Sequence, residues 1–344
     1  MHTPSVTLRS RALVLLGLLG LAAASVLTPT AARAADDPAA VAWSVETVDG
    51  AAGTDRPNFA FAVDPGAVLS DALRVTNTGA TALDLAVYAA DAYTTTTGNI
   101  DLNTPDVPST DAGTWVAVDV DRLSLAPGQQ ADIPFTIAVP ADAAPGDHSA
   151  GIITSLSSDD GGTLSVDRRL ATRVDLRVSG ELAPAVQITD LRTEYVGTWN
   201  PFAPGTLVVD YRLVNIGNTR VAGDDTIIAE GPFGLAGGAS AAAALHEVLR
   251  GSEIDVRREI EVAPWGLITG SVTVQPLVAG YGAQRLDDLV ADFSVPAVPW
   301  ALLAIFVVIA AAVTIVVLLV RRRSRGAVTA TGEAAVVAAV PTGA

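Results

Sequence analysis

Residues 146–152 read GDHSAGI and bring together the side chains best suited to nucleophilic chemistry in this sequence. A serine between small residues, beside a histidine, is typical of a nucleophile elbow, where Ser149 would attack an acyl carbon. Such an elbow needs a strand before the serine and a helix after it. Here the turn-like VPADAAP precedes it, the β-branched IITSLSS follows, and Asp147 replaces the first glycine. The stretch therefore predicts a turn at Pro145–Gly146 and a strand from Ser149 to Leu156.

Other reactive side chains are sparse. The one further histidine that could act as a base, His246, lies in LHEVLRG, far along the chain. Two distant histidines without any cysteine do not form a zinc pattern, and the acidic clusters DVD and SSDDGG do not match an EF-hand loop. We expect no catalytic, metal-binding or cofactor-binding residue. A glycosidase using two loop carboxylates stays an alternative, because such acids can come from anywhere in a chain.

Three aromatic residues are candidates for contacting a glycan. Tyr88, Tyr93 and Trp115 are conspicuous in a sequence that is only 5% aromatic. Sugar rings stack on aromatic faces while polar neighbours bond to the hydroxyl groups. A tryptophan and several tyrosines are also ordinary components of a β-sandwich core, and we regard that interpretation of these residues as the stronger one.

The elements that would position these residues are strands. ADIPFTIAV places Ile133, Phe135, Ile137 and Val139 on one face, and TLVVDYRLV does the same with alternate residues from Leu207. Short runs of this kind are separated by Gly, Pro, Asn and Asp turns, which is typical of an all-β sandwich. A strand, an Asn-x-Gly turn and a second strand occur in both halves, at Asn77 and at Asn215. The sequence predicts two tandem immunoglobulin-like β-sandwiches, residues 35–180 and 181–294.

Both ends of the chain carry membrane-related signals. A basic start, a short apolar run and Ala32-Arg33-Ala34 predict a secretory signal peptide over residues 1–34. Residues 297–320 are uncharged and long enough to cross a bilayer as a helix. We expect four arginines to hold the following side in the cytoplasm, Arg321, Arg322, Arg323 and Arg325. The rest of 321–344 is small-residue sequence predicted to be disordered, so the chain is expected at the cell membrane as a single-pass protein with its bulk outside.

Charge and composition exclude several classes of partner. Residues 35–296 contain 36 acidic groups against 14 arginines, a net charge of about −22. Binding to nucleic acid releases counterions from phosphates and requires cationic side chains, so we expect no nucleic-acid partner. The chain has no cysteine, so disulfides cannot stabilise it and packed cores must.

The order of features over residues 41–178 resembles a known family. RPNFAFAVDPGAVLSDALRVTNTG, then WVAVDVDRLSLAPGQQADIPFTIAVP, then PGDHSAGIITSL look like the peptidoglycan-binding domain of WxL-interacting proteins. The matching elements are a Pro-Gly turn, an Asn-x-Gly turn, a Leu-x-Pro-Gly turn and the Pro-Gly strand entry. The resemblance implies a domain that touches peptidoglycan and a protein that helps display partner surface proteins. It transfers no binding residue, because the matched positions are turn and core positions, and residues 181–294 do not match the family's second domain.

These observations predict a non-enzymatic, membrane-anchored surface protein that binds peptidoglycan or another envelope component. Two alternatives stay open. The first is a surface scaffold that binds only a protein partner by edge-strand pairing. The second is an envelope glycan hydrolase using loop carboxylates.

Overall fold

The computed structural model describes residues 41–50, 52–158, 166–200, 203–235, 237–264, 266–280 and 284–336. The chain is mostly β-structure and has one apolar helix near its C-terminus, as the sequence predicts. The predicted signal peptide lies outside the described residues.

The strands fall into two groups, each with its own hydrophobic core. The N-terminal group comprises β1 (Trp43–Thr47), β2 (Phe59–Val63), β3 (Val68–Asn77), β4 (Leu83–Thr94), β5 (Ile100–Leu102), η1 (Ala112–Thr114), β6 (Val116–Val118), β7 (Arg122–Leu125), β8 (Gln130–Ala138), β9 (Gly146–Ser158) and β10 (Val166–Val178). The C-terminal group comprises β11 (Val186–Val196), β12 (Gly205–Asn215), β13 (Val221–Glu230), η2 (Pro232–Gly234), β14 (Gly238–Ala239), β15 (Ala243–Val248), β16 (Glu253–Val262), β17 (Gly266–Val278) and β18 (Leu289–Ala297). The helix α2 (Trp300–Val336) follows.

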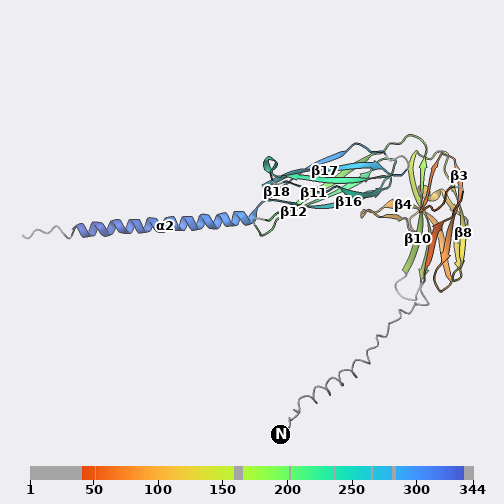
Figure 1. Ribbon diagram of the computed structural model, residues 1–344, viewed down its shortest axis with the longest axis horizontal. Helices are drawn as coiled ribbons and strands as arrows, with labels where there is room; N and C mark the ends of the chain where they lie inside the picture. The colour runs from red at the N-terminus through yellow and green to blue at the C-terminus, as the bar shows by residue number, and fades with distance from the viewer. Residues whose placement is uncertain are drawn as a thin grey trace, which may run out of the picture.

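Each group is built from two sheets (Figure 1). In the N-terminal group the strand orders are β1-β3-β8-β6 and β2-β10-β9-β4-β5, with β7 beside β4. In the C-terminal group they are β11-β12-β16 and β14-β13-β17-β18, with β15 beside β13. The alternation in β8 buries Ile133, Phe135 and Ile137, which confirms the face predicted from the sequence. The pairing of β2 with β10 is parallel, and the other strand pairs described are antiparallel.

The predicted internal repeat is visible in matching hydrogen bonds at two asparagines. The Asn77 side-chain amide donates to the carbonyls of Thr81 and Leu125, and its Oδ1 accepts from the Gly79 N–H. Asn215 makes the same three bonds, to Thr219 and Val248 and from the Gly217 N–H. Each asparagine is buried at the end of a strand, where it satisfies backbone groups that the turn leaves unpaired.

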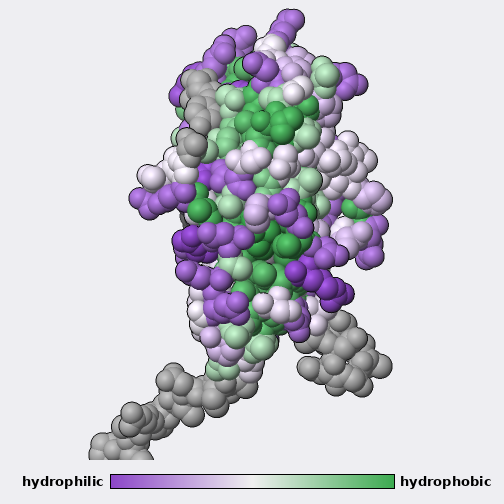
Figure 2. Space-filling model, turned by 90° about the vertical axis from the view of Figure 1, so that its right-hand side faces the viewer, coloured by the Kyte–Doolittle hydropathy of each residue, from purple (hydrophilic) through white to green (hydrophobic). Residues whose placement is uncertain are grey.

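One face of the N-terminal group is mixed in character. On the side of the molecule where Figure 1 places β3 and β8, hydrophobic residues gather along the middle of the surface and hydrophilic residues flank them (Figure 2). Arg74 of β3 pairs here with Asp132 of β8 at 2.6 Å, and both side chains are exposed to solvent. Exposed ion pairs of this kind contribute about 0–1 kcal/mol to stability, so this pair does little to hold the fold.

The helix α2 extends further than expected. Its apolar part, Trp300–Arg322, has a mean hydropathy of 3.3 and none of it is buried against the rest of the protein. Arg321 and Arg322 are the last two residues of this part and are exposed; the side chains of Arg323 and Arg325 lie outside the described residues. Beyond Gly326, where the sequence analysis predicts disorder, the helix continues to Val336. Alanine and arginine are strong helix formers, which accounts for this continuation.

Candidate functional site

The GDHSAGI stretch forms the start of β9, which confirms the predicted strand. Ser149 donates a hydrogen bond to Asp175 at 2.8 Å, and His148 contacts Asp111 at 2.6 Å. Consecutive side chains of a strand point to opposite faces of the sheet, so His148 cannot serve Ser149 as a base. No helix follows the serine, and this geometry does not form a nucleophile elbow.

Gly146, the first residue of the stretch, brings the two strand groups into close contact. Its φ is +124°, and a Cβ placed there would lie 2.1 Å from the backbone oxygen of Asn218. The Asn218 side-chain amide in turn donates to the Pro145 carbonyl at 2.9 Å. Only glycine permits both this backbone conformation and this approach.

Asp147 connects the two groups most directly. Its carboxylate is 2% exposed and accepts two bonds of 2.7 Å from Arg177 of neighbouring β10. It also accepts the backbone N–H of Arg220 at 2.7 Å, while its own N–H donates to the Asn218 carbonyl at 2.7 Å. Arg177 in turn donates to the Ala279 carbonyl at 2.9 Å. The hydrogen bond to Asp147 raises the pKa of Arg177.

A second buried carboxylate, Asp175, extends this network. It receives ion pairs from Arg173 at 2.7 Å and from Arg220 at 2.9 Å. Both arginines also reach Glu247 of β15, at 3.2 and 3.0 Å. Burial raises the pKa of Asp175, and the two arginines oppose that rise. We call these six residues the interface network: Asp147, Arg173, Asp175, Arg177, Arg220 and Glu247.

A hairpin adds neutral contacts beside the interface network. The Thr94 hydroxyl at the end of β4 donates to the Glu247 carbonyl and accepts the Leu249 N–H, both at 3.0 Å. The Thr96 carbonyl accepts the Asp255 N–H at 2.8 Å. In Figure 1 this hairpin reaches from β4 toward the C-terminal group. The ion pairs and these hydrogen bonds together link the two strand groups at several points.

An open backbone edge lies on the strand that carries half of this network. The 13-residue β10 pairs with β9 along its whole length, but β2 covers only Val174–Val178. Among the described residues, no strand pairs with the outer side of residues 166–173. We call this segment the free edge of β10. Leu170 lies on the same face of β10 as the core residues Val174 and Leu176, but it is 39% exposed.

A groove runs beside the free edge of β10. Its volume is about 470 Å³, and its lining includes Val45–Asp49 along β1, Arg56, Arg74 and Thr172 of β10. Arg56 fixes one side of it, because its guanidinium donates to Asp71 at 2.7 Å and to the Val48 carbonyl at 2.6 Å. The hydrogen bond with Asp71 raises the pKa of Arg56.

The other long edges each carry a feature that hinders strand pairing, and β10 itself lies beside β1 of the facing sheet. The pairing of β11 with β12 shifts register between Thr189 and Arg192, a bulge of the kind that blunts edges. β16 carries charged side chains along most of its length, and its Asp255 N–H donates to the Thr96 carbonyl. β18 lies beside β11 of the facing sheet. The other edge strands are short.

The three aromatic residues proposed as glycan contacts do not form one surface. Trp115 packs against the His148 ring, with centroids 4.6 Å apart, and against the N-terminal core. Tyr88 lines a shallow pocket, and Tyr93 is partly exposed. Because five positions separate them on β4, Tyr88 and Tyr93 project from opposite faces. A contact role for each of the three stays a prediction.

Comparisons with known proteins find similar solved structures but no matching family. The chain matches no protein-family model and no curated protein sequence. It is similar to a chain of the chaperone–tip adhesin complex of CFA/I fimbriae, with 12% identity and a TM-score of 0.37 over 74% of this chain and 100% of that one. It is also similar to a class 5 fimbriae chaperone, with 11% identity and a TM-score of 0.33 over 72% of this chain and 98% of that one. A chaperone of Pseudomonas aeruginosa matches with 14% identity and a TM-score of 0.29 over 69% of this chain and 97% of that one. At these identities the likeness is one of fold alone.

These findings correct three expectations. The resemblance to WxL-interacting proteins is wrong, because no family model matches and the similar structures are fimbrial chaperones. The expected function, peptidoglycan binding, and the expected partner, peptidoglycan, both depended on that resemblance. Both expectations are therefore wrong. The physical reason is visible in the matched motifs. The Asn-x-Gly turn satisfies strand-end backbone groups, and Pro145–Gly146 joins the two strand groups, so both motifs reflect the fold and not a ligand.

Proposed function

We propose that this chain is a membrane-anchored surface protein that binds a protein partner by strand addition at the free edge of β10. In this proposal the two strand groups are tandem immunoglobulin-like sandwiches, and α2 crosses the membrane with the arginines from Arg321 onward on the cytoplasmic side. The observation that carries it is the edge of residues 166–173, with which no strand among the described residues pairs, beside a groove.

Strand addition uses backbone groups for affinity and alternate side chains for specificity. A partner strand beside residues 166–173 would continue the sheet at the point where β2 stops. Its inward side chains would cover Leu170, which the present sheets leave partly exposed. Charged neighbours such as Arg168 discourage indiscriminate pairing between copies, because charges on edge strands oppose edge-to-edge association.

Anchoring is supported by the composition of α2. A helix of 23 residues with a mean hydropathy of 3.3 and no burial against the protein is long enough to cross a hydrocarbon core of about 30 Å. Its apolar surface has no partner among the described residues, and a bilayer would supply one.

Photocrosslinking in intact cells tests the partner site. A photoreactive amino acid at Leu170 should form a covalent adduct with a second protein, whereas the same residue at Val290 of β18 should not. Leu170→Lys places an inward-pointing charge on the edge, a device that blocks strand pairing. Combined with a photoreactive residue at Ala171, it should reduce the adduct about tenfold, which corresponds to about 1.4 kcal/mol.

Val290→Lys is the matched control, because Val290 is also exposed on a strand outside the core. It should leave the adduct unchanged. Equal adducts at positions 170 and 290, or an adduct that survives Leu170→Lys, would rule out strand addition at this edge.

A further inference from the structure

The end of the C-terminal group that adjoins α2 carries fully exposed aromatic residues. Trp199, in the turn between β11 and β12, is 94% exposed, and Phe233 of η2 is 98% exposed. Trp300, the first residue of α2, is 73% exposed. Folded proteins seldom present large aromatic side chains this completely to water, so their shared location calls for a physical explanation.

Strand register places these three residues at one end of the molecule. Gly266 of β17 pairs with Ala297, three residues before α2 begins, and Glu230 pairs with Thr269 just before η2. Gly205, which follows the turn of Trp199, pairs with Val262 close to the start of β17. In Figure 1 this end of the strand group faces the start of α2. We call it the helix-proximal end.

The aromatic residues are held in defined positions. Phe233 has a φ of +62°, a conformation that costs a non-glycine residue about 1–3 kcal/mol. Two backbone hydrogen bonds close its turn, from Gly231 to the Leu235 carbonyl and from Gly234 to the Gly231 carbonyl. A strained turn that directs an aromatic side chain away from the protein indicates a contact outside it.

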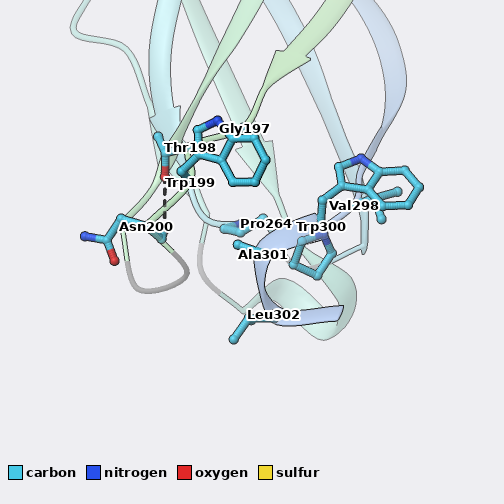
Figure 3. A pocket seen from close by; sticks show the side chains of 10 residues that line it. Gly197, Thr198, Trp199, Asn200, Pro264, Val298, Trp300, Ala301 and Leu302 are labelled. Carbon is cyan, nitrogen blue, oxygen red and sulfur yellow. Dashed lines mark hydrogen bonds between the residues drawn. The ribbon is translucent and has the colours of Figure 1, made fainter. Parts of the chain in front are cut away.

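Between Trp199 and Trp300 lies an apolar cavity of about 290 Å³ (Figure 3). Pro264 also lines it, as does Leu302 of α2. The first turn of α2, Trp300–Leu302, forms part of the cavity lining.

Charge distinguishes the helix-proximal end from the rest of the surface. No Asp, Glu, Lys or Arg occurs in residues 197–205, 231–245, 263–268 or 295–320. Elsewhere residues 35–296 carry a net charge of about −22, which an anionic bilayer surface would repel. The segments nearest α2 are therefore the ones that can approach a bilayer closely.

We infer that the helix-proximal end is seated in the headgroup region of the bilayer crossed by α2, with Trp199, Phe233 and Trp300 as its anchors. Tryptophan and other amphipathic aromatic residues favour this depth of a membrane. The inference rests on the proposed anchoring through α2 and adds to it that the C-terminal strand group lies against the membrane surface, held by Trp199 and Phe233 as well as by α2.

The chain has no cysteine, so single labels can be introduced cleanly. The full-length protein carrying Phe233→Cys or Trp199→Cys is labelled with an environment-sensitive fluorophore and reconstituted in phosphatidylcholine vesicles. Both labels should show blue-shifted emission and several-fold stronger quenching by lipids with a headgroup nitroxide than a label at Ile216→Cys. Ile216 is the control because it is also exposed, at 62%, but follows β12 at the opposite end.

Flotation of the vesicles tests anchoring through α2 separately from seating of the helix-proximal end. If the protein floats with the vesicles while the labels at 233 and 199 emit as in water, seating of the helix-proximal end is refuted and the anchoring stands. If the protein does not float, the anchoring and the inference fail together.

Discussion

Some core-facing strand positions hold charged side chains, although the alternation of apolar and polar residues along the strand predicts apolar ones. Arg258 interrupts the apolar face of β16, and the structure pairs it with Asp225, which is buried. Asp225 also accepts the Tyr211 hydroxyl at 2.8 Å. Burial, reinforced by the negative charge of Asp225, raises the pKa of Tyr211 far above its usual value near 10.

This shift predicts a loss of stability in alkali. Above about pH 10 the unfolded chain releases the Tyr211 proton and the folded chain keeps it, so the free energy of unfolding falls as pH rises. The contribution of this one group is about 1.4 kcal/mol per pH unit. Tyr211→Phe should remove it and cost about 1 kcal/mol at neutral pH through the lost hydrogen bond. Urea unfolding between pH 8 and 11 measures both, with Tyr93→Phe as control; equal slopes in the two variants would contradict the assignment.

At the scale of elements, the entry into β9 determines how closely the two groups pack. Gly146 is required there for two reasons, its positive φ and its approach to Asn218. Gly128 shares the first requirement, with a φ of +73°, but has no heavy atom within 4 Å of an added Cβ. The two glycines separate the conformational effect from the steric one.

Gly146→Ala should therefore destabilise the protein more than Gly128→Ala. Replacing a glycine of positive φ with alanine lowers the free energy of unfolding by about 1 kcal/mol because the alanine backbone is strained there. The clash of the new Cβ with Asn218 adds to this loss at Gly146. Thermal unfolding of both variants gives the comparison. Equal losses of Tm would mean that Asn218 moves away without cost and that the close approach is not important for stability.

Elements differed in how far the sequence could predict them. The alternation in β8 and β12 fixes their buried faces, because apolar side chains repeat at the strand period. Arg173, Asp175 and Arg177 also alternate, on the other face of β10, but a solvated face shows the same pattern. Only the position of Arg220, in the turn before β13, makes that face an interface, and nothing local to β10 specifies it. The free edge of β10 depends likewise on where β2 stops pairing, a tertiary property.

For the whole molecule, the interface network links two groups that have separate hydrophobic cores. Its three arginines and three carboxylates balance in charge, and Asp147 and Asp175 are buried. Removing one partner from such a network leaves an uncompensated buried charge, which costs about 3–5 kcal/mol.

Asp147→Asn should accordingly lower stability by about 3–5 kcal/mol and split the unfolding transition in two, because each group keeps its own hydrophobic core. Calorimetry of the full chain in detergent resolves the transitions. Asp132→Asn, which breaks only the exposed pair with Arg74, is the control and should cost about 0–1 kcal/mol. A single transition in Asp147→Asn with a small loss of stability would show that the hairpin contacts at Thr94 are sufficient.

The hairpin contacts and the salt bridges between the groups also have a mechanical consequence. A tensile load applied at β10 enters the strand that bears Arg173 and Arg177, and these residues pass it across the interface to β15 and to the loop after β17. The chain then continues through β18 into α2 without a flexible linker. A pull on the outer edge of the N-terminal group therefore loads the ion pairs between the two strand groups before it loads either hydrophobic core.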